Sequence, residues 1–225
     1  MAGNSTRVFI VSGPSGSGKT TVVDDLLAAL PGMIFSVSYT TRAPREGEQN
    51  GREYFFVSRE EFEAMKARGE FLEQAMVYAD FYGTHRSALE EAARQGKDLL
   101  LDIDVQGALQ VKKKHPAAIA IMILPPSAQE LEKRLRARGL DTAERIARRL
   151  KTARWEVGNY PHYDYVVINR DREQARALVR AIVAAEQGQS GDGAEARRQA
   201  DRARPAASSG QVSAILETFP QETNV

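Results

Sequence analysis

The hydrophobic positions of this 225-residue chain fall into two patterns that alternate along the sequence. Short continuous apolar runs predict buried strands. These runs occupy residues 8–11, 98–104, 118–124 and 163–169, and residues 53–58 resemble a further strand. Elsewhere, apolar residues at helical spacing predict amphipathic helices. The predicted helices cover residues 20–30, 58–69, 87–97, 107–116, 127–139, 141–157 and 172–187.

Capping signals support several of these helix boundaries. Three segments begin with a serine that is followed three residues later by a glutamate, which is the pattern of a capping box. The pairs are Ser58 with Glu61, Ser87 with Glu90, and Ser127 with Glu130. The first helix is expected to stop at Pro31 and Gly32, because proline and glycine both interrupt helices.

The alternation of strands and helices favours an α/β fold, in which a parallel sheet is flanked by helices. Residues 36–97 are more mixed and interrupt the alternation, as an inserted lobe would. Residues 188–225 are rich in Gly, Ala, Ser and Arg and contain few large apolar side chains. We therefore expect a disordered tail there, in which residues 212–219 fray rather than dock.

The composition limits the possible functions. The net charge is +1, so no global field indicates binding to nucleic acid, and an anion site would have to be local. The absence of cysteine excludes a disulfide framework and a thiolate zinc site, and it fits a reducing compartment. No apolar run reaches the roughly 18 residues that span a bilayer, and the N-terminus lacks the pattern of a signal peptide. We expect a cytoplasmic protein without a membrane or nucleic-acid partner.

Residues 13–20, GPSGSGKT, match the pattern G-x-x-x-x-G-K-[ST] between a predicted strand and a predicted helix. The three glycines allow backbone N–H groups to point at phosphate oxygens, and the helix dipole adds positive potential. Lys19 would reach the β- and γ-phosphates, and Thr20 would offer its hydroxyl to Mg²⁺. A glycine-rich turn beside a surface lysine is the alternative, but the strand–loop–helix context favours a nucleoside triphosphate site.

Two carboxylates end the predicted strand at residues 98–104. Asp102 and Asp104 lie at its carboxyl end, where the metal ion and its water ligands are bound beside a phosphate loop. We expect Asp102 to bind Mg²⁺ together with Thr20, partly through water. A strand-end acid that only starts a turn is the alternative for each aspartate.

Residues 36–54, SVSYTTRAPREGEQNGREY, predict a second anion site. Arg42 and Arg45 flank a proline in a segment rich in turn residues and hydroxyl groups. Two guanidinium groups can form forked contacts with one phosphate, and a tyrosine hydroxyl can add another donor. A solvated basic loop is the alternative for the two arginines alone, and the matching groups that follow in the sequence disfavour it.

Over residues 7–187 the chain resembles the guanylate kinase family. The matching motifs occur in the family's order: GPSGSGKT, SVSYTTRAPREGE, GEFLE, YGT, LLLDIDVQG, PPS and YDYVVIN. The resemblance implies a Mg²⁺-dependent phosphotransferase that converts ATP and GMP to ADP and GDP in purine metabolism, with dGMP also accepted. It implies a P-loop core in residues 1–35, 98–133 and 159–187, a GMP-binding lobe in residues 36–97 and a helical lid in residues 134–158.

The resemblance also implies roles for individual side chains. The GMP phosphate would bind Arg42, Arg45, Tyr54 and Tyr82. The guanine base would bind Ser38, Glu73, Thr84 and Asp104. ATP would bind Gly13, Pro14, Ser15, Gly16, Ser17, Gly18, Lys19, Thr20 and Thr21, with Asn169 near its base. The catalytic residues would be Lys19, Arg42, Arg134, Arg138 and Arg149.

These residue types suit the implied reaction. A carboxylate such as Glu73 can accept both the N1–H and the 2-amino group of guanine, whereas adenine lacks the amino group and has an acceptor at N1. No general base is required, because a phosphate monoester with a second pKa near 6 is mostly a dianion at neutral pH. The reaction instead requires positive charge to offset the repulsion between two phosphate groups.

Three other functions remain as alternatives. A non-catalytic guanylate-kinase-like interaction module is opposed by the intact Lys19 and Thr20. A P-loop kinase for another nucleoside monophosphate is opposed by the combination of Ser38, Glu73 and Thr84. A GTPase switch would need an Asn-Lys-x-Asp segment to bind guanine at the P-loop nucleotide, and the sequence contains none.

Overall fold

The computed structural model describes residues 6–77, 79–137, 139, 142–188 and 193–220 of the chain. The chain divides into two compact units. Unit 1 comprises residues 1–10 and 30–119, and unit 2 comprises residues 11–29 and 120–225. Unit 1 thus contains all of residues 36–97, and unit 2 contains the glycine-rich loop that starts at Gly13.

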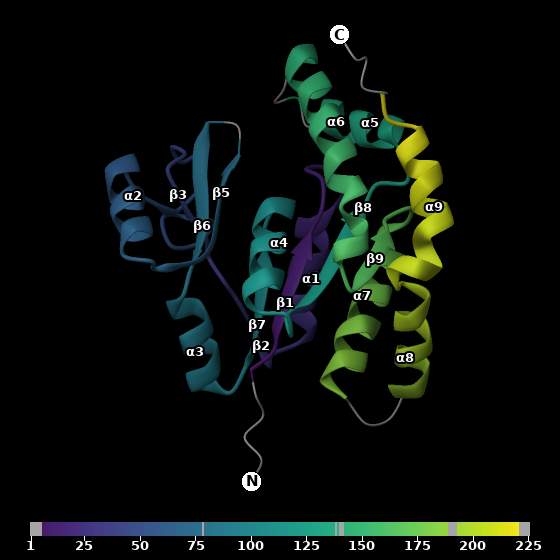
Figure 1. The fold of residues 1–225 in the computed structure, drawn as a ribbon, viewed down its shortest axis with the longest axis horizontal. Coiled ribbons are helices and arrows are strands. Elements are labelled where there is room, and N and C mark those ends of the chain that lie inside the picture. The colour runs from purple at the N-terminus through teal and green to yellow at the C-terminus, as the bar shows by residue number, and fades with distance from the viewer. Residues whose placement is uncertain (1–5, 78, 138, 140–141, 189–192, 221–225) are drawn as a thin grey trace. The chain divides into compact units, whose positions relative to one another are not determined.

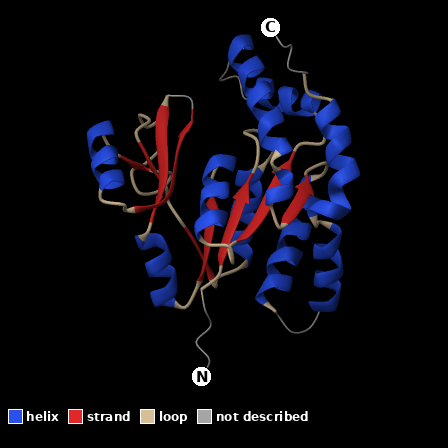
Figure 2. Cartoon of the chain, viewed as in Figure 1, coloured by secondary structure: helices blue, strands red, loops and turns tan. Residues whose placement is uncertain are grey.

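The larger of two sheets is parallel, has the strand order β2-β7-β1-β8-β9 and is flanked by helices (Figure 1; Figure 2). Its strands are β1 (Val8–Ser12), β2 (Met33–Phe35), β7 (Asp98–Asp102), β8 (Ile119–Leu124) and β9 (Tyr165–Ile168). The predicted α/β fold is therefore confirmed, and the four apolar runs form β1, β7, β8 and β9. The three-residue strand β2 was not predicted, because it is too short to give a pattern.

Unit 1 contains a second sheet with the order β4-β3-β6-β5. Its strands are β3 (Tyr39–Thr40), β4 (Phe55–Phe56), β5 (Phe71–Val77) and β6 (Asp80–His85). β3 pairs in parallel with β4, and the other two pairings are antiparallel. The side chains of Phe62, Met65 and Phe71 form a small apolar core beneath this sheet. The sheet is the structural reason why residues 36–97 break the strand–helix alternation.

The helices of unit 1 are α2 (Arg59–Ala67), α3 (Ser87–Gln95) and α4 (Val105–Lys114). Ser58 caps α2, since its hydroxyl accepts a hydrogen bond from the Glu61 N–H. The same prediction for Ser87 is wrong. Arg86 is the N-cap of α3 without a side-chain hydrogen bond, and the Ser87 hydroxyl lies 2.7 Å from Nδ1 of His85 instead. Ser87 is the first residue of α3 and lies only two residues after the end of β6, so its hydroxyl bonds to the side chain of the last strand residue and does not cap the helix.

The helices of unit 2 are α1 (Lys19–Ala29), α5 (Ala128–Ala137), α6 (Ala143–Gly158), the 3₁₀ helix η1 (Tyr160–His162), α7 (Arg172–Gln187), α8 (Gly193–Arg202) and α9 (Pro205–Glu217). Ser127 caps α5 as predicted, because its hydroxyl accepts from the Glu130 N–H. Within the described ranges of the chain, no helix combines the length and the apolar character that crossing a membrane requires.

The expectation of a disordered tail is wrong for residues 193–217, which form α8 and α9 (Figure 1). Val212, Ile215 and Phe219 are almost completely buried. Val212 and Ile215 are three residues apart on one face of α9, and Phe219 lies two residues after the helix, so the burial of all three stabilises this segment. The small side chains of Ala200 and Ala203 are buried as well, so a composition poor in large apolar residues still packs.

Candidate functional site

The loop of residues 13–18 lies in unit 2 and curls tightly between β1 and α1. Gly13 and Gly18 have φ angles of 134° and 103°, which residues with side chains rarely adopt. A Cβ atom would lie 2.2 Å from the Ile123 carbonyl oxygen at Gly13 and 2.3 Å from Nδ2 of Asn169 at Gly18. Both positions therefore require glycine, because the loop backbone packs directly against β8 and Asn169.

Lys19 and Thr20 begin α1 at the end of this loop. The Lys19 Nζ atom donates to the carbonyl oxygens of Gly13 at 2.7 Å and Pro14 at 3.2 Å. Thr20 is exposed in the first helical turn, where backbone N–H groups have no intrahelical partner. The ammonium group and the helix N-terminus together make this loop a positive site suited to phosphate. The other predicted loop residues are Gly16 and Ser17, which are buried, Ser15, which is exposed, and Thr21, which is partly exposed.

Arg134, on α5, lies against the same loop. Its Nη1 donates to the Ser17 carbonyl oxygen at 3.3 Å, and its Nη2 donates to the Asn169 carbonyl oxygen at 3.0 Å. Asn169 follows β9 and is buried, and its Nδ2 donates to the Ser17 carbonyl oxygen at 2.8 Å. Its Oδ1 is also buried and accepts no hydrogen bond within the described part of the chain. Asn169 therefore presents an acceptor next to the loop.

Arg149, on α6, also contacts the loop. Its Nη1 lies 3.2 Å from the Ser15 hydroxyl oxygen, to which it donates. The structure thus brings Arg134 and Arg149 to the predicted phosphate loop of unit 2. Arg138, the third arginine predicted for the lid, lies outside the described residues.

Unit 1 holds the second group of predicted side chains, centred on Glu73. Glu73 on β5 is paired with Thr84 on β6, and the Thr84 hydroxyl donates to Oε1 of Glu73 at 2.7 Å. Glu73 is only 3% exposed. Burial raises the pKa of Glu73 to about 7; the hydrogen bond from Thr84 opposes this shift, and the charge of Asp104 adds to it. A carboxylate in this environment favours a ligand that donates hydrogen bonds to it.

Asp104 and Glu73 both lie against Gly107 in the first turn of α4. Oδ1 of Asp104 accepts a hydrogen bond from the Gly107 N–H at 2.7 Å, so Asp104 is the N-cap of α4. A Cβ atom at Gly107 would lie 2.5 Å from Oε2 of Glu73 and 3.2 Å from Oδ1 of Asp104. The missing side chain at Gly107 therefore allows the two predicted base-binding carboxylates to come together.

The backbone on either side of Glu73 is hydrogen-bonded to α4. Nε2 of Gln110 donates to the Gln74 carbonyl oxygen at 2.7 Å, and the Gln74 N–H donates to Oε1 of Gln110 at 3.2 Å. Nζ of Lys114 donates to the Leu72 carbonyl oxygen at 2.8 Å. These bonds pair backbone groups of β5, which is an edge strand. Gln110 and Lys114 were missed by sequence reasoning, although their spacing of four residues places them on one helical face.

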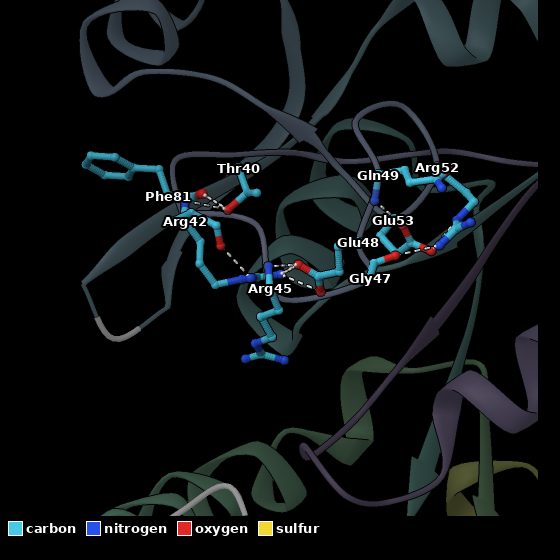
Figure 3. Close-up of polar contacts among 10 residues, drawn as sticks. Thr40, Arg42, Arg45, Gly47, Glu48, Gln49, Arg52, Glu53 and Phe81 are labelled. Atoms are coloured by element: carbon cyan, nitrogen blue, oxygen red, sulfur yellow. Dashed lines mark hydrogen bonds and ion pairs between the residues drawn. The ribbon is translucent and has the colours of Figure 1, made fainter.

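Arg42 lies in the loop between β3 and β4 and is paired with Glu48 (Figure 3). Nη2 of Arg42 lies 2.9 Å from both carboxylate oxygens of Glu48, and Nη1 donates to the Ala43 carbonyl oxygen at 2.7 Å. The Arg45 N–H donates to Oε2 of Glu48 at 2.7 Å, whereas the Arg45 side chain extends away from Glu48 (Figure 3). Burial raises the pKa of Glu48, but the hydrogen bonds from Arg45 and Arg42 lower it, and the net shift is downward. Glu48 therefore remains ionised and fixes the arginine loop. Sequence reasoning gave it no role.

Two tyrosines complete this cluster. The Arg42 Cζ atom lies 5.3 Å from the centroid of the Tyr54 ring, and the Tyr54 and Tyr82 centroids are 5.7 Å apart. Burial raises the pKa of Tyr54, and the charges of Tyr82 and Asp102 add to this shift. The Tyr54 hydroxyl is therefore protonated at neutral pH and can donate a hydrogen bond to an anion.

Two other residues that were predicted as ligands, Ser38 and Asp102, also lie in unit 1. Ser38 is partly exposed before β3, and its carbonyl oxygen accepts from the Phe55 N–H at 2.9 Å. Asp102 is partly buried at the carboxyl end of β7, near enough to Tyr54 to affect its pKa. Among the residues that the structure describes, no three His, Cys, Asp or Glu side chains gather into a metal site.

Comparisons with known proteins agree on one family. The guanylate kinase family model matches residues 5–186. A guanylate kinase of Koribacter versatilis is 55% identical over 185 residues, which cover 81% of this chain and 79% of that protein. A guanylate kinase of Dechloromonas aromatica is 50% identical over 185 residues, which cover 82% of this chain and 90% of that protein.

The solved structures give the same result. A crystal structure of guanylate kinase from Anaplasma phagocytophilum superimposes with a TM-score of 0.68 at 36% sequence identity. The match covers 83% of this chain and 89% of that one. The resemblance seen in the sequence motifs is confirmed, and this chain belongs to the guanylate kinase family.

Proposed function

We propose that this chain transfers the γ-phosphoryl group of ATP to GMP and releases ADP and GDP. The observation that carries this proposal is the buried Glu73 carboxylate, which is fixed by Thr84 and lies beside Asp104 against Gly107. Such a group binds a base that presents hydrogen-bond donors and excludes a base that does not. The names of the relatives point to the same reaction.

Guanine fits the Glu73 site by its hydrogen-bonding pattern. The N1–H and the 2-amino group of guanine are adjacent donors, and a carboxylate has lone pairs for both in addition to the one used by Thr84. Ser38 would donate to O6 of the base, whereas the single hydroxyl proton of Thr84 is already donated to Glu73. Adenine would place its N1 lone pair against the carboxylate, which leaves buried polar groups unpaired.

The GMP phosphate would bind at the arginine loop. Arg42, Tyr54 and Tyr82 form one cluster, and Arg45 lies in the same loop. Guanidinium groups form short charge-assisted hydrogen bonds with phosphate oxygens. Bonds of this kind would hold the acceptor oxygen in position for attack.

ATP would bind at the glycine-rich loop of unit 2. Lys19 and the N-terminus of α1 would bind the phosphates, and the buried Oδ1 of Asn169 provides an acceptor for the adenine amino group. An oxygen of the GMP phosphate then forms a bond to the γ-phosphorus, and the bond to the β–γ bridging oxygen breaks. The electron pair of that bond leaves with ADP. Arg42, Arg134 and Arg149 would stabilise the charge of the transferred group.

Mg²⁺ fits the donor chemistry of the chain. The exposed Thr20 hydroxyl and the Asp102 carboxylate are oxygen ligands, which Mg²⁺ prefers, and the ion commonly takes its other ligands from substrate phosphates and water. When bound, the ion would neutralise phosphate charge. This chain would contribute Thr20 directly and Asp102 in part through water.

We also propose that the chain works as a core of residues 1–35, 98–133 and 159–187, a GMP-binding lobe of residues 36–97 and a lid of residues 134–158. Closure of the lobe and the lid would exclude water from the γ-phosphoryl group.

The proposed function is tested by comparing acceptors. With ATP and Mg²⁺, purified protein should convert GMP to GDP, accept dGMP, and leave AMP, CMP and UMP largely unreacted in a coupled assay. Equal turnover of AMP would favour a kinase for another monophosphate. Complete inactivity with every acceptor would favour a non-catalytic interaction module.

The pKa of Glu73 gives a pH dependence. Because burial raises this pKa to about 7, the carboxyl group becomes protonated as the pH falls below 7 and can no longer accept both guanine donors. The ionised fraction falls about eightfold between pH 7.5 and 6.0. We expect kcat/KM for GMP to fall by that factor, in addition to a roughly twofold loss from protonation of the GMP phosphate.

The Glu73→Gln variant provides the control for this pH profile. Glutamine does not titrate, so its smaller kcat/KM should retain only the twofold loss caused by the GMP phosphate. The same pH dependence in both proteins would assign the profile to another group.

A further inference from the structure

The C-terminal helices α8 and α9 lie beyond residue 186, where the match to the family model ends. In Figure 1 they continue from α7, pass along β9 and end beside α5 and α6. All of these elements belong to unit 2. Helix α9 has 13 residues and therefore spans about 20 Å. Its two ends make different and specific contacts.

The first end of α9 is fixed to the sheet edge. β9 is an edge strand, and its Val166 N–H donates to the Ala203 carbonyl oxygen at 2.7 Å. The Arg204 guanidinium carbon lies 4.2 Å from the centroid of the Tyr165 ring. Arg204 Nη2 and the Tyr165 hydroxyl both contact the Glu186 carboxylate. The linker between α8 and α9 is thus anchored at this edge of the sheet.

The second end of α9 is bonded to α6. The Arg154 Nη1 atom donates to the Leu216 carbonyl oxygen at 2.8 Å and to the Phe219 carbonyl oxygen at 3.5 Å. The last carbonyl groups of a helix have no intrahelical partner, and they carry the negative end of the helix dipole. The Leu216 carbonyl oxygen also accepts from the Phe219 N–H at 3.2 Å, and the Arg154 guanidinium group adds a charged donor at this negative end of the helix. Phe219 is 2% exposed, so its side chain is buried beside this contact.

The same end of α9 is bonded to α5. Thr218 is the C-cap of α9, and its hydroxyl oxygen accepts a hydrogen bond from the Ala128 N–H at 2.8 Å. Ala128 is the first residue of α5, where the N–H groups lack partners within the helix. The C-terminal end of α9 is therefore bonded both to the N-terminus of α5 and to Arg154 in the C-terminal half of α6.

We infer that residues 193–220 act as a strut that holds α5 and α6 in place for phosphoryl transfer, with Arg154 and Thr218 as positioning residues. The inference rests on the proposed function, because α5 and α6 carry Arg134 and Arg149. These two arginines contact the phosphate loop at the Ser17 carbonyl oxygen and the Ser15 hydroxyl. Neither Arg154 nor Thr218 touches the loop, so both act through the helices.

The strut should affect the rate rather than GMP binding. A misplacement of about 1 Å at catalytic groups can cost up to 10²-fold in rate. The predicted GMP-binding side chains all lie in unit 1, whereas the strut and the helices it holds lie in unit 2. Loss of the strut contacts should therefore lower kcat and leave KM for GMP unchanged.

The test compares single substitutions in the full chain. Arg154→Ala should lower kcat about 10-fold while KM for GMP changes less than twofold. Arg154→Lys should recover part of the loss, because the ammonium group can still donate to one carbonyl oxygen. Thr218→Val, which keeps the side-chain shape, should lower kcat about threefold. Arg148→Ala removes an exposed arginine from the same helix and is the matched control, with kcat within twofold of the parent.

Hydrogen exchange separates the strut from the proposed function. In Arg154→Ala, amides of α6 and of the first turn of α5 should exchange about 10-fold faster than in the parent protein. Unchanged exchange there would overturn the strut even if the parent protein makes GDP. Faster exchange with unchanged kcat in both Arg154→Ala and Thr218→Val would also overturn it, because the segment would then only stabilise the fold. If Arg154→Ala does not fold, the hydrogen exchange and kcat of Thr218→Val decide whether the strut exists. A parent protein that makes no GDP would contradict the proposed function, while the exchange data would still test the strut.

Discussion

Replacement of Lys19 by alanine is expected to lower kcat by about 10³-fold, which abolishes useful phosphoryl transfer. The Lys19 ammonium group lies over the glycine-rich loop, where it bonds to the carbonyl oxygens of Gly13 and Pro14. With ATP bound, it would move to the phosphates and offset the charge that develops on them. Removal of one preorganised electrostatic contact typically costs 10²- to 10³-fold in rate, and this one carries a full charge.

The effect of Lys19→Ala should be confined to the ATP half of the site. Lys19 lies in unit 2, and the predicted GMP ligands lie in unit 1. The dissociation constant for GMP, measured by calorimetry, should therefore stay within twofold of the parent value. Lys113→Ala, which removes an exposed lysine from α4, is the matched control and should retain full activity. A Lys19→Ala protein that melts normally and keeps more than a tenth of the parent kcat would remove the loop from the mechanism.

Local features of the site could be predicted from the sequence, because the loop depends on neighbouring residues. Strand β1, the glycine-rich turn and α1 are continuous in the chain, and each has its own pattern. The turn needs glycine at Gly13 and Gly18 for its φ angles, so the motif itself specifies the backbone. The same holds for the caps of α2 and α5, where serine and its N–H partner are three residues apart.

Features that depend on distant residues could not be predicted. Glu73 is fixed in part by Gln110 and Lys114, which hold the backbone of β5 from a helix about 40 residues further along the chain. No local pattern identifies the partner of an edge strand. Asp104 was predicted as a base ligand, but its role as the N-cap of α4 was missed. The predicted helix began at Gly107, whereas α4 begins at Val105, directly after Asp104.

The C-terminal segment shows a different limit of sequence reasoning. Its composition is typical of disorder, because few large apolar residues are available to offset the entropy of folding. The structure compensates with small residues that pack closely and with the buried side chains of Val212 and Ile215 on α9 and of Phe219 just after it. The hydrogen bonds that Arg154 of α6 and the Ala128 N–H of α5 donate to the end of α9 add to this packing. Composition averages over a segment, whereas docking depends on a few positions with the right spacing.

Replacement of Glu73 by glutamine is expected to lower kcat/KM for GMP by 100-fold or more. Glutamine keeps the size of the side chain and one carbonyl oxygen, which can still accept from Thr84. Its NH₂ group, however, would face a donor of guanine where the carboxylate presented an acceptor. Because Glu73 is 3% exposed, water cannot satisfy the mismatched groups, and the full cost appears in GMP binding.

The discrimination between bases is the decisive readout for Glu73→Gln. KM for ATP should change less than twofold, since the ATP ligands lie in the other unit. The ratio of kcat/KM for GMP to that for AMP should fall, because glutamine removes the repulsion that adenine meets at a carboxylate. Glu63→Gln, an exposed position on α2, is the matched control and should leave this ratio unchanged. If Glu73→Gln also preserves the ratio, then the base is recognised by another group, and the buried carboxylate serves only to fix β5 against β6 and α4.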